Sequence, residues 1–242
     1  MAGYLTPSLL INQDIMLDAG SFSTELTFKQ QLRLDHVLVS HAHCDHIKSL
    51  ALFADLIIGH RKKPVKVHAS PKAMQVIRGD FFNNRFWPDF FMLPNPENPV
   101  LKAAQFEPRR SFKVGGLTVR AIPVSHPVES MAFIIRGPTG TFVYTGDTGP
   151  THNLWKAVNR VKNLKLLMIE TKFPNGLQVV ADAAGHLTPR TLEQELKKID
   201  APRVPILLYH LKPDCMRELE KEIAALGDRR IRIMKIGDRY KV

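Results

Sequence analysis

The chain has 242 residues, 44% of them hydrophobic, and is long enough to bury a sizeable core as one large domain or two small ones. The sequence has no run of about eighteen apolar residues, and its start lacks a basic segment before a long apolar stretch, so we expect neither a membrane span nor a signal peptide. The basic residues behind the net charge of +11 are scattered, so the charge favours a phosphate-bearing ligand only weakly. The two cysteines are too few for a disulfide framework, which indicates reduced thiols in a cytoplasm.

Short strands and helices alternate along the first half of the chain. Apolar runs bounded by turn residues predict strands, and apolar residues at helical spacing predict helices. Pro71 is well placed to open a helix, because proline is tolerated in a first turn. The expected strands are residues 9–11, 15–17, 37–40 and 65–67, and the expected helices are residues 45–55 and 71–77.

The second half repeats this alternation. Thr188 is expected to cap a helix whose first residue is Pro189. Strands at both ends with helices between predict an α/β (α+β) fold of two sheets sandwiched by helices, and the lack of a linker favours a single domain over residues 1–242. The expected strands are residues 117–124, 132–135, 141–144, 166–169 and 206–208, and the expected helices are residues 154–161, 189–199 and 216–226.

Potential metal ligands crowd into residues 41–46, directly after the strand predicted at residues 37–40. Strand alternation sends His41 and His43 to one side, and the following turn lets Asp45 and His46 point to a neighbouring spot. One loop can therefore serve two adjacent metal positions. The alternative is that these histidines are solvated loop residues without a function. So tight a cluster in a chain with 10 histidines disfavours that alternative.

Further polar residues lie where later strands end. His126, Asp147 and His210 each follow a predicted strand, and His186 lies just before a predicted helix. Any one of them alone would be explained as a hydrogen-bonded structural residue. Together with the first cluster, they favour a functional site, because strand-to-loop junctions are where α/β proteins place ligands and catalytic groups.

These residues resemble the motif of the metallo-β-lactamase fold hydrolases, which implies a four-layer αββα sandwich. The resemblance assigns His41, His43 and His126 to a first metal. It assigns Asp45, His46 and His210 to a second metal, with Asp147 as the bridging carboxylate. Asp18 matches a position that supports the ligands without binding a metal itself.

Within that superfamily the chain resembles the class II cyclic-nucleotide phosphodiesterases over nearly its whole length. One departure follows the first motif, where a small residue pair is usual and residues 47–50 read Ile-Lys-Ser-Leu. We expect Lys48 to face solvent. The blocks that carry the narrower resemblance are Phe82-Asn-Asn84 with Trp87-Pro88, Gly146-Asp-Thr-Gly-Pro150, Ile169-Glu-Thr-Lys-Phe-Pro-Asn175, Gly185-His-Leu-Thr-Pro189 and His210-Leu-Lys-Pro213.

The implied reaction is hydrolysis of 3′,5′-cyclic nucleotides, cAMP or cGMP, to 5′-monophosphates by a hydroxide that bridges two divalent metal ions. Imidazoles with carboxylates suit Zn²⁺, and Fe or Mn are alternatives. The expected catalytic residues are Asp45, His186 and Glu170. His186 either binds a phosphoryl oxygen or donates a proton to the departing O3′, or else only supports the metal ligands or caps a helix. Glu170 either orients a histidine or shuttles protons, or else only packs.

Residues 81–110 form an aromatic and proline-rich stretch, which we expect to be an irregular insertion at about residues 80–110. It offers a surface on which a base stacks, with Asn83 or Asn84 hydrogen-bonding the base edge and Trp87 beside it. His186 and Thr188 complete the expected substrate contacts. The same aromatics equally suit a satellite core or the interface of a homodimer.

Two other classes of function remain open, another hydrolase and a non-catalytic binding protein. A tRNA 3′-end endonuclease or a glyoxalase II-type thioesterase uses the same metal centre, and a nucleic-acid binder could keep the fold without catalysis. The aromatic character of residues 81–99 disfavours a tRNA-binding arm, and the complete ligand set disfavours a non-catalytic protein. The expected partner is therefore a cyclic nucleotide rather than nucleic acid or a membrane.

Overall fold

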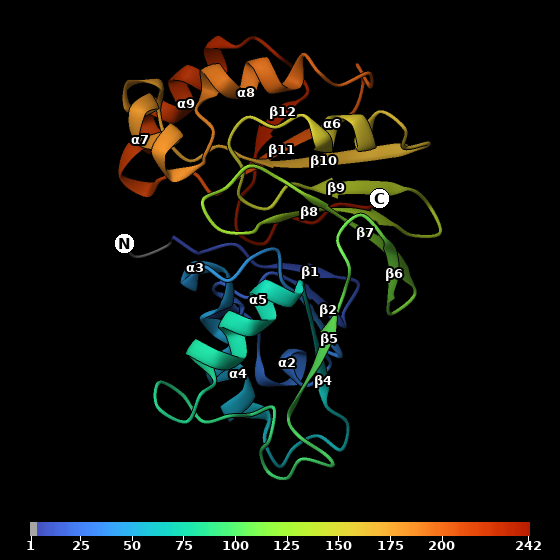
Figure 1. The fold of residues 1–242 in the computed structure, drawn as a ribbon. Helices are drawn as coiled ribbons and strands as arrows, with labels where there is room; N and C mark the ends of the chain where they lie inside the picture. The colour runs from blue at the N-terminus through green and yellow to red at the C-terminus, as the bar shows by residue number, and fades with distance from the viewer. Residues whose placement is uncertain (1–3) are drawn as a thin grey trace. The chain divides into compact units, whose positions relative to one another are not determined.

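The computed structural model describes residues 4–242, which form two compact units. One unit comprises residues 5–107, and the other comprises residues 108–242 together with Tyr4. Each unit has one β-sheet and its own helices (Figure 1), which confirms the expected α/β class. The division into a single domain stays a prediction, and the start of the chain, on which the signal-peptide expectation rests, lies partly outside the described residues.

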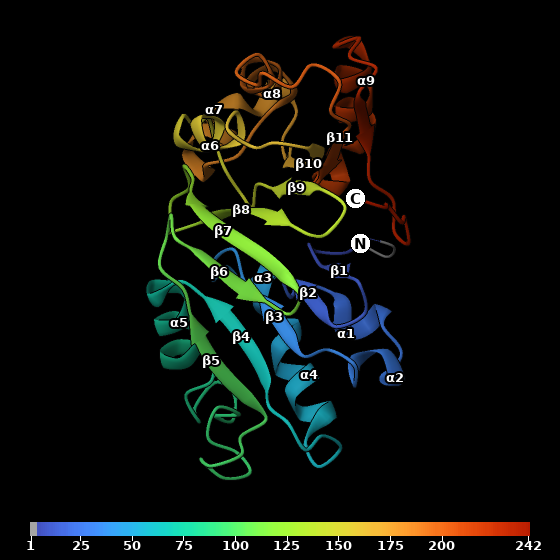
Figure 2. The same cartoon turned by 90° about the vertical axis from the view of Figure 1, so that its right-hand side faces the viewer.

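The unit of residues 5–107 is built on a five-stranded sheet in the order β1-β2-β3-β4-β5. β1 pairs antiparallel with β2, and the remaining neighbours are parallel (Figure 2). Its strands are β1 (Leu9–Ile11), β2 (Ile15–Leu17), β3 (His36–Leu38), β4 (Val65–Ala69) and β5 (Leu101–Gln105). Its helices are α1 (Phe22–Glu25), α2 (Phe28–Gln31), α3 (Cys44–Ile47), α4 (Ser49–Ile57), α5 (Pro71–Val76) and the π-helical turn η1 (Ile77–Phe81).

The helix expected over residues 45–55 is divided into α3 and α4 at Lys48. The reason is a competing hydrogen bond, because the N–H of Ser49 donates to the carbonyl of Ala19 at 2.9 Å. The Ser49 hydroxyl also donates to the carbonyl of Gly20 at 2.8 Å. These bonds tie the start of α4 to the turn after β2, and apolar residues of α4 such as Phe53 then bury against the sheet.

The unit of residues 108–242 contains a seven-stranded sheet in the order β12-β11-β10-β9-β8-β7-β6. Strands β9 to β12 run parallel, whereas β6 to β9 alternate in direction. Its strands are β6 (Ser111–Val114), β7 (Leu117–Pro123), β8 (Met131–Arg136), β9 (Thr141–Tyr144), β10 (Leu164–Glu170), β11 (Ile206–Tyr209) and β12 (Ile231–Ile233). Its helices are α6 (Asn153–Val158), α7 (Gln178–Ala184), α8 (Pro189–Leu196) and α9 (Met216–Ala225), with 3-10 turns η2 (Asn175–Leu177) and η3 (Pro213–Cys215).

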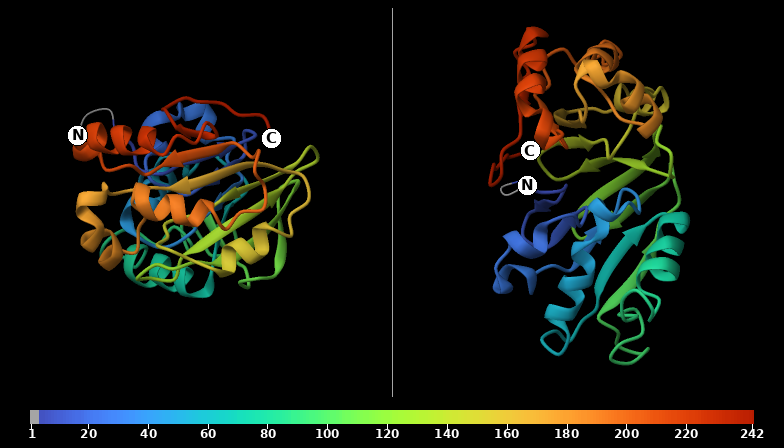
Figure 3. Two further views of the ribbon diagram at one scale, coloured as in Figure 1. Left: turned by 90° about the horizontal axis from the view of Figure 1, so that it is seen from above. Right: turned by 90° about the vertical axis from the view of Figure 1, so that its left-hand side faces the viewer.

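Helices α6, α8 and α9 cover one face of this sheet (Figures 1 and 3). Alternate strand residues, for example Leu167 and Ile169, bury against Leu192 and Leu219 of the helices. Burying each such side chain contributes about 1.5–3 kcal/mol before entropy is counted. The core therefore holds the sheet rigid, and the strand ends carry the polar side chains. Among the described residues, no helix combines the length and apolar character needed to cross a membrane.

A buried histidine in the first sheet gives a stability prediction. Burial, with the adjacent His36 and Lys66, lowers the pKa of His68 from 6.5 to about 4. Between these two values His68 is protonated in the unfolded chain and neutral in the folded chain. The free energy of unfolding therefore decreases as the pH falls from 6.5 towards 4. At pH 5 the loss from this residue amounts to about 2 kcal/mol.

We expect metal-free His68→Gln to lose less stability than the parent protein between pH 7 and pH 5. Urea unfolding at each pH, followed by circular dichroism, measures the difference. Groups other than His68 and the adjacent His36 titrate alike in both proteins, so the difference reports this histidine pair. Parallel pH profiles would show that His68 is protonated in the folded state.

Candidate metal centre

The loop after β3 and the helix α3 that follows it carry four candidate ligands: His41, His43, Asp45 and His46. The loop joins a parallel strand to α3, for which His43 is the N-cap residue, so the motif lies at the carboxyl end of a strand as predicted. His41 and His46 are buried, and the other two are partly exposed. His41 Nε2 lies 3.1 Å from His43 Nδ1. Lys48 is exposed, which confirms that it faces solvent.

Asp18 supports this loop from a fully buried position. Its Oδ1 accepts from the Ser40 N–H at 2.7 Å, and its Oδ2 accepts from the Ser40 hydroxyl at 2.7 Å and lies 2.8 Å from His46 Nδ1. Since the Ser40 hydroxyl donates to Asp18, its oxygen accepts from His41 Nδ1 at 3.0 Å. Asp18 thus fixes both rings so that Nε2 of each is the nitrogen that can bind a metal.

Replacing Asp18 by asparagine tests this support. Asparagine tolerates the positive φ of 54° at this position, so the backbone conformation is retained. One carboxylate oxygen becomes an amide donor, however, and faces groups that also donate. We expect metal affinity to fall about 10–100-fold. Competition with a chromophoric chelator measures it, with Asp55→Asn, an exposed position on α4, as the control. Equal affinities for the two variants would contradict the proposed support.

Four strand ends of the second sheet meet at one edge. β7 and β9 are both antiparallel to β8, and β9, β10 and β11 are mutually parallel, so these four strands share one direction. Their carboxyl ends therefore lie at the same edge of the sheet. The residues that this edge carries are His126 after β7, Asp147 after β9, Glu170 at the end of β10 and His210 after β11.

His126 is oriented by the turn that ends α7. Its Nδ1 donates to the carbonyl of Gly185 at 2.9 Å, which directs Nε2 away from that bond. Gly185 has a φ of +66°, and a Cβ there would lie 2.6 Å from Pro127 Cδ and 3.1 Å from His126 Nδ1. Only glycine satisfies both demands. His126, Asp147 and His186 offer ligand atoms that all lie within 4.8 Å of one another.

Asp147 is buried and held by its neighbours. The Tyr209 hydroxyl donates to the carbonyl of Gly146 at 2.6 Å, and the Ser130 hydroxyl donates to the carbonyl of Asp147 at 2.9 Å. These bonds fix the backbone on either side of the carboxylate. Asp147 Oδ2 lies 3.1 Å from His210 Nε2, so these two candidate ligand atoms are close neighbours.

Glu170 and His186 form a buried pair. Glu170 Oε1 accepts from His186 Nδ1 at 2.7 Å and from the N–H of Thr148 at 3.1 Å, and Oε2 accepts from the N–H of Leu187 at 3.4 Å. Burial, together with the nearby Asp147, raises the pKa of Glu170 well above its usual range, and His210 and the two backbone N–H groups offset only part of this. With three donors converging on it, the carboxylate acts as an acceptor and fixes the ring of His186, as one of the predicted roles of Glu170 requires.

The expected base-binding residues lie elsewhere in the first unit. The N–H of Leu101, at the start of β5, donates to Phe90, so the aromatic stretch packs at the amino ends of the parallel strands, opposite the edge that carries His41. The Asn83 amide bonds within its own loop, to Gly79, Asp80, Arg85 and Phe86, and Asn84 Oδ1 accepts from Asp89. Trp87 packs partly buried against the core. The structure therefore does not bring these three residues together with the His41–His46 loop, and their contact with a base stays a prediction.

Thr188 is fully buried and caps α8. Its Oγ1 accepts from the N–H of Thr191 at 3.3 Å and donates to Gln178 Oε1 at 2.7 Å. The capping role is confirmed, and the hydroxyl is already used within the protein. A substrate contact from this hydroxyl would have to replace one of those bonds.

Sequence reasoning gave no role to three residues that shape the site: Ser40, Gly185 and Lys172. Lys172 Nζ lies 3.2 Å from His186 Nε2. Lys172 stands two residues after Glu170, so the alternation of an extended chain would have predicted that the two side chains lie on the same side. Ser40 acts through its hydroxyl and its N–H, and Gly185 acts through its backbone, and both roles depend on partners that the sequence pattern does not reveal.

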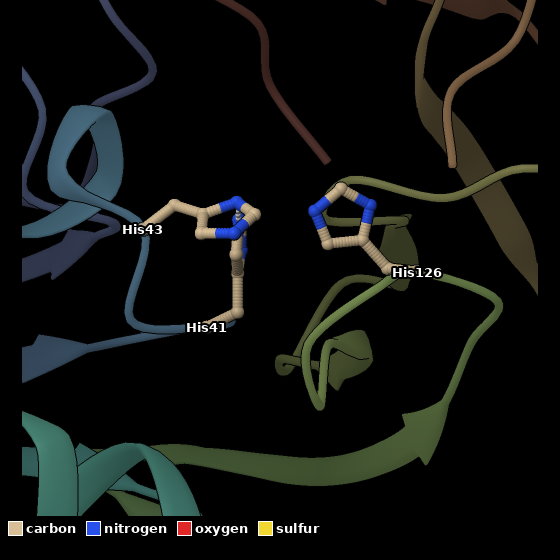
Figure 4. Close-up of side chains that lie close together, drawn as sticks. All are labelled: His41, His43 and His126. Carbon is tan, nitrogen blue, oxygen red and sulfur yellow. Dashed lines mark hydrogen bonds between the residues drawn. The ribbon is translucent and has the colours of Figure 1, made fainter. Parts of the chain in front are cut away.

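The ligand types fit a divalent metal. Neutral imidazole nitrogens and carboxylate oxygens are the donors that Zn²⁺, Fe and Mn accept, and Nδ1 of His46 and His126 is engaged by an oxygen as metal-binding histidines require. Figure 4 draws one of the candidate ligand groups, in which His41 and His43 come from the loop after β3 and His126 comes from the segment after β7. Asp45, His46, Asp147 and His210 make up another.

Two sheets with their helices and a His/Asp ligand set at strand ends define a metallo-β-lactamase fold. The crystal structure of unliganded yeast PDE1 shares this fold with a TM-score of 0.74, at 20% identity over 86% of this chain and 68% of that chain. A model of the beta-lactamase superfamily domain matches residues 15–210. The chain belongs to this superfamily.

Two curated relatives are similar in sequence. A probable 3′,5′-cyclic-nucleotide phosphodiesterase of Yersinia pestis is 32% identical over 212 residues, which cover 77% of this chain. A 3′,5′-cyclic-nucleotide phosphodiesterase of Aliivibrio fischeri is 26% identical over 224 residues, which cover 82% of this chain. The chain spans 59% and 65% of the length of these relatives.

Proposed function

We propose that the chain binds two divalent metal ions. His41, His43 and His126 would hold the first metal, Asp45, His46 and His210 would hold the second, and the Asp147 carboxylate would serve both. The completeness of this seven-residue set carries the proposal. Support comes from Asp18 and Gly185, which orient His46 and His126 as ligands.

We further propose that the protein is a phosphodiesterase that hydrolyses 3′,5′-cyclic nucleotides such as cAMP and cGMP to 5′-monophosphates. The names of the two curated relatives support this substrate class. The chemistry of the site supports it as well, because a phosphodiester repels a nucleophile by its negative charge and has a poor leaving group. A cationic centre neutralises the negative charge of the phosphodiester and stabilises the charge that develops on its oxygens.

When bound, the metal pair supplies Lewis acidity and lowers the pKa of a water molecule. The protein's own residues then fix the rest of the geometry. Glu170 accepts from His186 Nδ1 at 2.7 Å, which holds the ring of His186 in one orientation. Asp18 keeps His41 and His46 in one orientation, which limits reorganisation during the reaction.

Parallel assays of one metal-loaded preparation test the proposal. We expect release of the 5′-nucleotide from cAMP or cGMP, and no turnover of precursor tRNA or S-lactoylglutathione. Elemental analysis should find close to two metal equivalents per chain. Exclusive cleavage of precursor tRNA or of the thioester would replace the proposed activity, and metal content near zero would favour a binding protein.

A further inference from the structure

Lys172 follows β10 in a tightly anchored segment. Its N–H donates to the carbonyl of Leu187 at 3.0 Å, and its own carbonyl accepts from the N–H of Lys212 at 2.9 Å. The first bond joins it to the residue after His186, and the second joins it to the segment that follows His210. The backbone of Lys172 is therefore fixed between two loops of the candidate site.

The ammonium group points at the site itself. Lys172 Nζ lies 3.2 Å from His186 Nε2, and an ammonium can only donate, so Nε2 accepts and the ring proton resides on Nδ1, which donates to Glu170. Glu170, His186 and Lys172 thus form a line of two hydrogen bonds. The ring of His186 lies 5.1 Å from that of His126 and 5.7 Å from that of His210, centroid to centroid. The ammonium therefore lies beside the candidate metal ligands.

This lysine differs from other basic residues of the same unit. Lys198 pairs with Glu195, Lys212 pairs with Asp214, and Arg230 pairs with Asp228. Within residues 4–242, the structure gives Lys172 a histidine partner and no carboxylate partner. A partly buried ammonium that is not neutralised by a carboxylate attracts an anion, and two of its three N–H donors are not used by His186.

We infer that Lys172 is a substrate-binding residue, which donates to a non-bridging phosphoryl oxygen while it holds His186 in the Nδ1–H form. This inference rests on the proposed function. A phosphodiester carries one negative charge and the monophosphate product carries about two near neutral pH, so both are suited to a lysine acting as a point charge. An ammonium cannot ligate a metal, so this role is separate from metal binding.

The test compares Lys172→Met, which keeps the chain length without the charge, with Lys172→Arg, which keeps the charge. Lys162→Met is the matched control, because Lys162 is an exposed lysine at the opposite end of β10. We expect Lys172→Met to lower kcat/KM for the cyclic nucleotide about 10–100-fold, mainly through KM. We expect 5′-AMP to inhibit it at least about tenfold more weakly, because the product carries the larger charge.

Binding of 5′-AMP by calorimetry gives a readout that does not depend on turnover, and metal content and thermal unfolding are measured on the same samples. Arginine should restore a substantial part of the 5′-AMP affinity. Unchanged KM and unchanged 5′-AMP binding in Lys172→Met would overturn the inference. So would a loss of binding accompanied by a loss of metal, since that result indicates a structural role.

The failure of the proposed function is distinguishable from the failure of this inference. A parent protein that does not hydrolyse cyclic nucleotides contradicts the proposed function. In that case the comparison of 5′-AMP binding between the parent protein and Lys172→Met still decides whether Lys172 binds phosphate.

Discussion

Replacing Asp45 by alanine is expected to reduce turnover of cyclic nucleotide at least about a thousandfold, which corresponds to about 4 kcal/mol of activation free energy. Asp45 lies in the first turn of α3, partly exposed, and carries the carboxylate that we assign to the second metal. Alanine leaves the helix intact, because it has the highest helix propensity. The loss therefore reports the carboxylate rather than the fold.

The measurement combines kcat at saturating metal with metal content per chain. Asp55→Ala is the control, since Asp55 is an exposed aspartate of the adjacent helix α4 and should leave activity unchanged. We expect Asp45→Ala to retain about one metal equivalent. A variant that keeps both metals and more than a tenth of the turnover would exclude Asp45 from the ligand set.

The second large effect is expected for Gly185→Ala. The added Cβ would lie 2.6 Å from Pro127 Cδ, and the residue must also keep a φ of +66°, which L side chains rarely adopt. The turn has to shift, and with it the carbonyl that holds His126 Nδ1. We expect about 1–3 kcal/mol of lost stability and a fall of about 10–100-fold in metal affinity.

Gly227→Ala separates the two causes. Gly227 has a φ of +65° but no atom within 4 Å of the position of a Cβ. It therefore shares the backbone strain of Gly185 without the steric clash. We expect Gly227→Ala to lose some stability and no metal affinity, whereas Gly185→Ala loses both. Equal metal affinities for the two variants would show that the turn at Gly185 does not position His126.

The element pattern of the sequence was a good guide where local preference and tertiary packing agree. The strands expected at residues 9–11, 15–17 and 141–144 appear at those residues, and Thr188 caps α8 as expected. The pattern failed at β5, whose sequence Leu-Lys-Ala-Ala-Gln has little strand propensity. β5 forms because it pairs along its whole length with β4, a contact that no local pattern encodes.

The aromatic stretch shows where composition is ambiguous. Phe82, Phe86, Trp87 and Phe90 suit a base-stacking wall, a small core or a subunit interface equally well, because aromatic composition is common to all three. The structure buries Phe82 and Phe90 in the core of the first unit and leaves Phe86 exposed. The direction of β5 places this stretch at the strand edge opposite the ligand loop, and its part in substrate binding stays a prediction.

The sequence by itself determined the ligand loop, because His41, His43, Asp45 and His46 are neighbours in the chain and need only a strand followed by a turn. Only the tertiary structure decided that His126, Asp147, Glu170 and His210 share an edge, since this depends on four strands running in the same direction. It also decided which nitrogen of each imidazole carries the proton. Asp18 sets the orientation of His46, and the Gly185 carbonyl sets that of His126. Glu170 with Lys172 sets the orientation of His186. Each of these partners is distant in sequence from the ring that it orients, so only the fold brings them together.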